Sequence, residues 1–531
     1  MSETLVLTNA RIYTLERATP TAEAVAVQGE RIVAVGRAAD MPPGRRIDLG
    51  GRTLLPAFTD SHLHIMHWAL GLDQIPLDGV PSLGETLRRV AERAATTPTG
   101  EWLQGWGWNA SAWPTGRPTR EDLDRVAPNH PVVLTHKSGH MIWANSLALQ
   151  VAGVTAATPN PPGGDIHHDA HGAPNGILTE NATDLVHDAV PVPDATQRRA
   201  ALGRAWPHFH RLGLVGGHEM GYADPLALWD DFSALQAEGR LPWRISHYIH
   251  KHQLEDMIRR GMRSWDGDHN LRVGGLKIFM DGALGSQTAD MLADYEGQPG
   301  NRGIVTTEVE ELHELAFRAA GHGIACAIHA IGDAANHKVL EVFAAWRAGP
   351  GKDSPLRHRI EHVQVIAPTD LPRLAQLGIV ASVQPIHATS DMAMVDRYWG
   401  KRGETAYAFC SLLSCGTRLA FGSDAPVETP DVMVGIHAAV TRQRADGQPP
   451  DGWYPEQRLS VYEAVHGYTL GAAYVTGEQG IKGSIAPGKL ADLAVLDKDI
   501  FASDPADILA TQVDATMLGG EWVYGGGQLE L

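Results

Sequence analysis

The sequence predicts an α/β protein, a distorted TIM (β/α)8 barrel with a small β-sandwich domain built from both chain termini. Three observations support this fold class. Apolar runs of strand length alternate with amphipathic, helix-like stretches along the middle of the 531-residue chain, as in parallel βα proteins. Eight such runs occur, which is the number of strands in a TIM barrel. Both ends of the chain instead carry short strand-like runs separated by Gly and Pro, a pattern typical of a β domain.

The terminal β domain is predicted from four segments. Two lie near the N-terminus, "TLVLTNARIYTLE" and "AEAVAVQGERIVAVG", and two near the C-terminus, "GSIAPGKLADLAVLD" and "ATMLGGEWVYGGG". Gly- and Pro-containing turns interrupt them, and no helical period runs through them. We therefore expect residues 1–55 and 480–531 to form the small β domain and residues 56–479 to form the barrel.

The eight predicted barrel strands are, in order, "TLLPAFTDSH", "LGLVGGHEM", "WRISHYIH", "GGLKIFMDG", "GIACAIHA", "RIEHVQ", "IVASVQP" and "RLAFGSDAP". Between them, "DAANHKVLEVFAAWRAG" has apolar residues three and four apart and predicts a helix. A second helix is predicted in "PTDLPRLAQLG", with Thr369 as its N-cap and Gly378 at its end. A Trp-, Pro- and Gly-rich insertion at about residues 75–195 separates the first two strands, and we expect it to shape the substrate pocket.

Composition limits the classes of partner and the compartment. The 44 basic and 62 acidic residues give a net charge of −18, which argues against binding to nucleic acid or to an anionic membrane. The N-terminus has no signal-peptide pattern and no segment is apolar enough to span a bilayer, so a cytoplasmic location is expected. Only three cysteines are present, too few for a disulfide framework or a cysteine-rich zinc site.

A metal site is predicted where the strands end. His62 and His64 are two residues apart at the end of the first strand, so their side chains point the same way. His329, His362 and Asp424 each close a later apolar run. Because the carboxyl ends of barrel strands converge on one face, these five side chains should meet. Imidazole and carboxylate ligands suit zinc, manganese or iron.

With these motifs in place, the sequence resembles the amidohydrolase superfamily along nearly its whole length. "LLPAFTDSHLH" resembles the first-strand signature of that superfamily, and "GSIAPGKLADLAVLD" resembles its C-terminal sheet motif. "GGLKIFMDGALGSQTA", "IHAIGDAA", "RIEHVQ" and "FGSDAPVE" are most similar to the branch of N-substituted formamide deformylases and related amide hydrolases. The resemblance implies one or two divalent metal ions per chain, with Zn²⁺ expected and Mn²⁺ or Fe²⁺ as alternatives.

Lys277 lies on the predicted fourth strand, where dinuclear members of the superfamily carry a lysine that reacts with carbon dioxide to form a metal-bridging carbamate. An ammonium group has only donors and cannot bind a cation, so an unmodified lysine would not suit a metal site. Two alternatives stay open. Lys277 can be an unmodified cation near Asp281 or the substrate, or Glu219 at the end of the second strand can serve a glutamate-bridged or single-metal site.

The resemblance implies hydrolysis of a non-peptide C–N bond, as in an N-acyl or N-formyl amine, by attack of metal-bound hydroxide. In this reaction Asp424 is both a metal ligand and the group that accepts the water proton and returns it to the leaving group. A role as ligand alone or as helix cap is the alternative for Asp424.

The expected partner is a small-molecule amide. A deaminase, a lactonase or a cyclic-amide hydrolase of the same fold is the alternative function, and a non-catalytic barrel scaffold is a more remote one. A homodimer is an alternative to a monomer.

Substrate-side residues are the least defined by sequence. "THKSGHMIWANSLAL" resembles the branch pattern on the substrate side, and other polar residues lie at or just after predicted strand ends. The candidates are His140, Trp143, Asn145, His218, His387, Arg397 and Tyr398. Packing inside the core or a loop is the alternative for each. The cluster of Trp102, Trp106, Trp108 and Trp113 is a candidate lining for an apolar or aromatic substrate cleft, with the core of the inserted subdomain as the preferred alternative. Asp60 is expected to orient a metal-binding histidine.

Overall fold

The computed structural model describes residues 3–110, 113, 118–137, 141–161 and 163–529. The chain divides into two compact units. One comprises residues 1–68 and 202–531, and the other comprises residues 69–201. The insertion predicted at about residues 75–195 falls inside the second unit. The boundaries predicted within the first unit, between residues 55 and 56 and between 479 and 480, stay a prediction.

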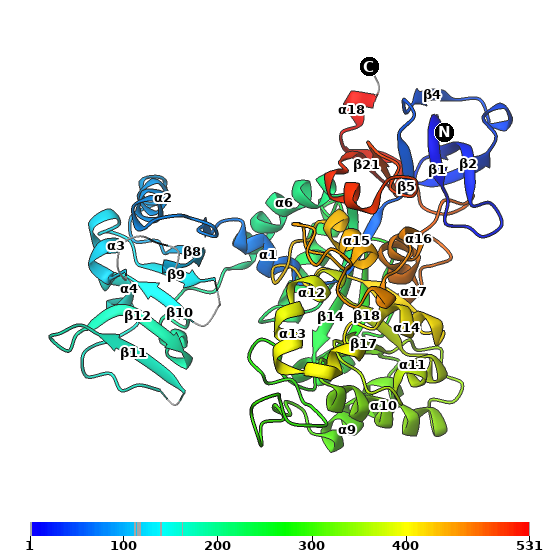
Figure 1. Ribbon diagram of the computed structural model, residues 1–531. Coiled ribbons are helices and arrows are strands. Elements are labelled where there is room, and N and C mark those ends of the chain that lie inside the picture. Colours follow the sequence, from blue (N-terminus) through cyan, green and yellow to red (C-terminus); the bar gives the residue numbers. More distant parts are fainter. Residues whose placement is uncertain (1–2, 111–112, 114–117, 138–140, 162, 530–531) are drawn as a thin grey trace. The chain divides into compact units, whose positions relative to one another are not determined.

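A parallel sheet of eight strands forms the barrel of the first unit (Figure 1). In spatial order its strands are β6 (Phe58–Leu63), β13 (Leu214–Glu219), β14 (Arg244–His250), β15 (Leu271–Phe279), β16 (Cys326–Ala330), β17 (Arg359–His362), β18 (Val380–Val383) and β19 (Leu419–Phe421). Nearly every residue of these strands is buried, which explains why they read as continuous apolar runs and not as alternating ones. All eight overlap the predicted runs, although the first part of the first run, Thr53–Pro56, forms a strand of another sheet. The predicted barrel is confirmed.

The first and last strands meet where the metal ligands lie. The backbone N–H of Asp424 donates to the carbonyl of His62 at 2.7 Å, and that of His64 donates to the carbonyl of Ala425 at 2.8 Å. Gly422 makes this approach feasible, because a Cβ there would lie 2.5 Å from the backbone nitrogen of His62. The segments that carry three predicted ligands are therefore joined directly through their backbones.

Helices follow the strands and cover the outside of the barrel (Figure 1). They are α7 (Pro225–Ala237), α8 (Leu254–Arg259), α9 (Val309–Gly321), α10 (Asp333–Ala348), α11 (Leu371–Leu377), α12 (Pro385–Ser390), α13 (Met392–Tyr398), α14 (Phe409–Ser414), α15 (Val432–Thr441), α16 (Val461–His466) and α17 (Ala472–Val475), with α1 (Ile65–Gly71) after β6 and α6 (Ala195–Arg211) before β13. Both predicted helices are present as α10 and α11. The cap of α11 is Asp370 and not Thr369 as predicted, because Pro372 favours the first turn and sets the start one residue later. Gly378 ends the helix in a left-handed conformation, as expected.

Among the described residues, every helix is too short or too polar to cross a membrane.

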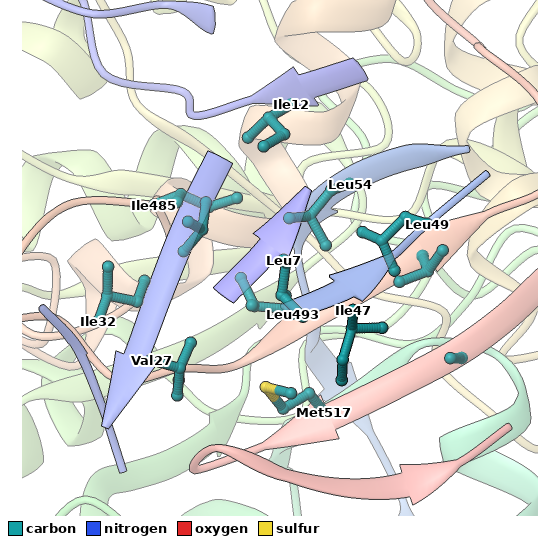
Figure 2. Packing of buried hydrophobic residues seen from close by; sticks show 14 residues of the cluster. Leu7, Ile12, Val27, Ile32, Ile47, Leu49, Leu54, Ile485, Leu493 and Met517 are labelled. Carbon is teal, nitrogen blue, oxygen red and sulfur yellow. The ribbon is translucent and has the colours of Figure 1, made fainter. Parts of the chain in front are cut away.

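Strands from both ends of the chain form one further sheet in the same unit, as predicted. Its order is β22 (Glu521–Tyr524), β21 (Val513–Leu518), β20 (Leu493–Leu496), β5 (Thr53–Pro56), β1 (Thr4–Tyr13), β2 (Thr21–Gln28) and β3 (Arg31–Gly36), with β4 (Arg45–Asp48) paired to β1. Figure 2 shows its apolar core, in which Leu7 and Leu54 from the N-terminal part lie near Leu493 and Met517 from the C-terminal part. A short helix, α18 (Gly526–Leu529), follows.

A buried ion pair joins this sheet to the barrel. Arg244 on β14 donates from Nε and Nη2 to the two carboxylate oxygens of Asp492, at 2.6 and 2.7 Å, and from Nη1 to Asn270 at 2.8 Å. The two side chains are 3% and 6% exposed.

Because a lysine cannot reproduce the two parallel hydrogen bonds, we expect Arg244→Lys to lower the free energy of unfolding by about 1.5–3 kcal/mol. Urea titration followed by circular dichroism would measure the change. Arg240→Lys is the matched control at an exposed pair and should cost less than about 0.5 kcal/mol.

The second unit has its own sheet and core. The strand order is β11 (Gly164–His168), β12 (Pro174–Glu180), β10 (Met141–Ala144), β9 (Val132–His136), β8 (Leu103–Trp108) and β7 (Ile75–Pro76). Its helices are α2 (Leu83–Thr96), α3 (Arg120–Val126), α4 (Ser146–Val151) and α5 (Asp184–His187). Trp108, Trp113 and Trp143 pack in one buried cluster. The expected alternative for the tryptophans, a core of the insertion itself, is therefore confirmed for Trp108 and Trp113, whereas Trp106 is 47% exposed.

Candidate metal centre

The predicted ligands lie at the carboxyl ends of four barrel strands. His62 is on β6, His329 is on β16 and His362 is the last residue of β17. His64 comes directly after β6, and Asp424 is in the loop after β19. In a strand, Glu361 and His362 would face opposite sides of the sheet. His362 has a φ of 75°, however, and this left-handed turn lets both side chains approach His62. Asp424 has a φ of 61°. Non-glycine residues held in this region are concentrated at functional sites.

His62, His64 and Asp424 form the first group able to hold a metal ion, since their ligand atoms lie within 4.8 Å of one another. Nε2 of each histidine is 3.4 Å from Oδ1 of Asp424. The Nδ1 atoms are already used, in His62 by Glu361 at 2.6 Å and in His64 by the carbonyl of Gly221 at 3.1 Å. Both partners are hydrogen-bond acceptors, so Nδ1 of each ring donates and the lone pair of each Nε2 is directed at the centre.

His362 and His329 lie on the other side of His62. The ring centroid of His362 is 4.8 Å from that of His62 and 4.6 Å from that of His329. Nδ1 of His362 is 2.8 Å from the side-chain oxygen of Gln384, and Nε2 of His329 is 3.0 Å from the carbonyl of Gly282. Each ring therefore keeps one nitrogen for a metal, Nε2 in His362 and Nδ1 in His329. Burial lowers the pKa of His329 to about 3 and that of His362 well below its usual value, so both rings are neutral.

His387 on α12 also reaches the centre. It forms a second group with His362 and Asp424, again with ligand atoms within 4.8 Å. Its Nε2 lies 3.9 Å from Oδ2 of Asp424. Burial alone would raise the pKa of Asp424, but its contacts with His62 and His64 hold that pKa well below the usual value. The carboxylate is thus ionised and lies between the two groups.

Lys277 is on β15, the fourth barrel strand, as its predicted position requires. Its side chain is buried, and its Nζ has no hydrogen-bond partner among the described residues. Burial lowers its pKa to about 8, against the opposing influence of Glu361 and Asp424. Carbon dioxide reacts with the neutral form of an amine. The lowered pKa increases the fraction of Lys277 in that form, and no hydrogen bond from the described residues occupies its lone pair.

A buried charge network under the centre was not predicted from sequence. Arg359 on β17 donates from Nη2 to Oε2 of Glu361 at 2.7 Å, and the same oxygen lies 2.6 Å from Nδ1 of His62. Arg359 also donates to the carbonyl of Ser61 and to the hydroxyl of Ser382. Burial alone would raise the pKa of Glu361, but Arg359 and His62 hold it well below the usual value. The motif "RIEH" contained the only sequence signal, two ionic residues two apart in a buried strand.

Three acidic residues considered in the sequence analysis have backbone partners. Asp60 accepts from the N–H groups of His62 and Ser423, at 3.0 and 3.1 Å, and so joins the first strand to the last. These hydrogen bonds hold the backbone of His62 and the segment that precedes Asp424, and the orienting role expected for Asp60 stays a prediction. Glu219 accepts from the backbone N–H groups of Gly221 and Met66, one on each carboxylate oxygen, and the glutamate-bridged alternative stays open. Asp281 accepts from Ile331, Gly332 and Asp290.

The predicted substrate residues separate into different places. Trp143 and Asn145 are fully buried in the second unit. Trp143 donates to the carbonyl of Thr119, and Asn145 caps α4 and bonds to the backbone of Val132 and His130. Their contacts are those of core residues, so the structure favours the packing alternative. His140 lies outside the described residues.

The remaining candidates lie in the first unit. His218 is buried inside the barrel, with its Nδ1 2.9 Å from Nη1 of Arg359, so it belongs to the charge network and not to a substrate surface. Arg397 and Tyr398 are on α13, with the guanidinium over the tyrosine ring. Of the predicted substrate residues, His387 is the one that the described structure places against the predicted ligands.

The donor set fits a divalent cation. Imidazoles with one ring nitrogen anchored, an ionised aspartate and a buried unpartnered amine converge on one region. Burying such groups without a function would be costly. Imidazole and carboxylate donors select zinc or a similar first-row metal ion.

A model of the amidohydrolase family matches residues 45–524. The chain belongs to the amidohydrolase family. This amidohydrolase is 36% identical over 489 residues to the protein YtcJ of Bacillus subtilis (strain 168), which carries a provisional amidohydrolase name, and the match covers 91% of each chain. It is 32% identical over 543 residues to the N-substituted formamide deformylase of Arthrobacter pascens, with 98% of each chain covered.

A solved structure agrees with this assignment. A metal-dependent hydrolase of Pyrococcus horikoshii OT3 superposes on this amidohydrolase with a TM-score of 0.80 and 27% identity, covering 94% of this chain and 99% of the other. The family and the fold together identify the amidohydrolase as a metal-dependent hydrolase. The predicted resemblance to the branch of formamide deformylases is confirmed.

Proposed function

We propose that this amidohydrolase cleaves a non-peptide C–N bond in a small N-acyl or N-formyl amine. The observation that carries the proposal is the convergence of His62, His64 and His362 on the ionised carboxylate of Asp424. The similarity to an N-substituted formamide deformylase supports the choice of bond. Zinc as the metal, a cytoplasmic location and a homodimer stay predictions.

The residues that would hold the metal follow from their free ligand atoms. His62, His64 and Asp424 would hold one divalent cation, and His329 and His362 a second, with a carboxylated Lys277 between the two. When bound, a cation of this kind lowers the pKa of a water molecule and polarises a carbonyl group. Glu361, Gly221 and Gln384 keep the histidine rings in orientation, so the site is arranged before the cation arrives.

Asp424 carries the proton transfer in this proposal. Its Oδ1 faces His62 and His64, while Oδ2 faces the side of His387. A carboxylate at this place can accept a proton from the attacking water and return it to the amine nitrogen as the C–N bond breaks. Its neighbours hold Asp424 ionised, so the carboxylate carries no proton before the water attacks.

The state of Lys277 gives a direct test of the metal centre. With bicarbonate present, we expect elemental analysis to find about two metal equivalents per chain and Lys277→Ala to bind about one, because the bridging group is lost. Carbon-13 bicarbonate should add a carbamate resonance that Lys277→Ala lacks. Lys401→Ala, at an exposed lysine, should change neither. One equivalent in the native protein, without a carbamate signal, would contradict the bridge and leave a single-metal hydrolase.

The reaction class requires a substrate panel. The metal-loaded protein should release an amine from N-substituted formamides or N-acyl amines at least tenfold faster, in kcat/KM, than it acts on lactones, cyclic amides or aminated heterocycles. The last three classes represent the alternative lactonase, cyclic-amide hydrolase and deaminase functions. A preference for one of them would overturn the proposed bond. No turnover of any class by protein of full metal content would favour the scaffold alternative.

A further inference from the structure

Two parallel imidazole rings flank the side of the centre that faces Oδ2 of Asp424. His362 and His387 are stacked with centroids 6.2 Å apart and an interplanar angle of 16°. Each Nδ1 meets the side chain of a buried glutamine. Nδ1 of His362 is 2.8 Å from Oε1 of Gln384, whereas Nδ1 of His387 is 3.4 Å from Nε2 of Gln364.

The two glutamines assign opposite tautomers to these rings. A glutamine oxygen only accepts a hydrogen bond, and its NH₂ group only donates. Nδ1 of His362 must therefore carry the ring proton, which leaves Nε2 as a lone pair for a cation. Nδ1 of His387 accepts from Gln364, so the ring proton of His387 is on Nε2. At Nε2, therefore, His362 offers a lone pair to a cation, whereas His387 offers an N–H donor.

The N–H of His387 has no acceptor in the described structure. The side chain is 94% buried, since its exposed fraction is 6%, and its Nε2 lacks a hydrogen-bond partner. Oδ2 of Asp424, at 3.9 Å, is too distant for a hydrogen bond. Because buried donors are nearly always satisfied, this one is explained by an acceptor that arrives with the substrate.

We propose that His387 is a catalytic residue that donates its Nε2–H to the carbonyl oxygen of the substrate, and that Gln364 is a positioning residue that fixes the required tautomer. This inference rests on the proposed amide hydrolysis. As the water oxygen bonds to the carbonyl carbon, the electron pair of the C=O double bond moves onto the oxygen. The N–H of His387 stabilises that charge without transferring its proton. The pair returns when the C–N bond breaks, and the departing nitrogen receives the proton held by Asp424.

Two substitutions of His387 test whether its function is to donate a hydrogen bond from Nε2. The amide of glutamine reaches the place of the histidine Nε2, whereas the shorter asparagine reaches only that of Nδ1. We expect His387→Asn to lower kcat by about 100- to 1000-fold, with KM changed much less, and His387→Gln to recover most of that loss. Metal content should equal that of the native protein in both variants. Loss of metal in both would show that His387 is a ligand and would overturn the inference.

The tautomer can be measured without any substrate. In zinc-loaded protein labelled with nitrogen-15 at histidine, resonances that disappear in His387→Gln belong to this ring. We expect an unprotonated Nδ1 and a protonated Nε2 in the native protein, and a protonated Nδ1 in Gln364→Glu, because a carboxylate can only accept. A protonated Nδ1 in the native ring would overturn the inference. Failure of the native protein to hydrolyse amides would instead contradict the proposed function and leave the ring measurement to decide the tautomer.

Discussion

Asp424→Asn should lower kcat for amide hydrolysis by about 10²- to 10⁴-fold, the usual contribution of a positioned proton carrier. The substitution keeps the shape of the side chain but removes the charge that contacts His62 and His64. Asparagine cannot accept a proton from water at neutral pH, so the loss should persist at saturating substrate. Steady-state kinetics on metal-loaded protein would measure it, with elemental analysis of the same sample to separate lost chemistry from lost metal.

Asp431→Asn is the matched control for this prediction. Asp431 is in the same segment after β19 and caps α15 by accepting from the N–H of Met433 at 2.9 Å. Asparagine caps helices about as well as aspartate, so this variant should keep kcat within about twofold of the native value. An Asp424→Asn enzyme with native kcat would show that another group carries the proton, and Asp424 would then be a ligand alone.

Glu361→Gln should lower both stability and metal affinity. Its carboxylate neutralises the guanidinium of Arg359, and both side chains are at most 1% exposed. Removing one partner of a buried ion pair leaves an uncompensated charge, which should lower the free energy of unfolding by about 3–5 kcal/mol. The same change weakens the hydrogen bond to Nδ1 of His62, so metal affinity should fall about 10- to 100-fold. Urea unfolding of metal-free protein and competition with a chelator would measure the two effects.

Two comparisons make the Glu361 result specific. Glu255→Gln breaks the exposed pair with Arg318 and should lower the free energy of unfolding far less than Glu361→Gln does, because solvent screens exposed pairs. Combining Arg359→Met with Glu361→Met removes both charges, so stability should be partly restored while metal affinity stays low, because His62 still lacks its partner. Full recovery of metal affinity in the double variant would contradict the orienting role of Glu361.

The sequence predicted the barrel because the signal for each strand is local. Burial on both faces makes a parallel strand apolar throughout, and each of the eight runs can be recognised within about ten residues. The ligands His62, His64, His329, His362 and Asp424 could be selected for a related reason, since a polar residue that closes such a run is unusual. Convergence of the strand ends then follows from the fold class and needs no coordinates.

The substrate candidates in the insertion had no comparable signal. Trp143 and Asn145 are polar or aromatic residues next to turns, a description that suits a pocket and a core equally well. Only the fold of the second unit shows that the amide of Asn145 is used by the backbone of Val132 and His130 and by α4. The same side chains can line a pocket or pack in a core, and only their hydrogen-bond partners in the folded chain distinguish the two roles.

The sequence by itself determined the barrel, its order of strands, and the residues of the first group able to hold a metal, His62, His64 and Asp424. Tertiary structure alone decided how those residues are held. Glu361 is 299 positions from His62 in the chain, yet their side chains are in contact, and two glutamines meet Nδ1 of His362 and of His387 with opposite ends of their amide groups. The physical reason is range: strand periodicity is set by neighbouring residues, whereas the orientation of a buried imidazole is set by whichever donor or acceptor folding brings against it.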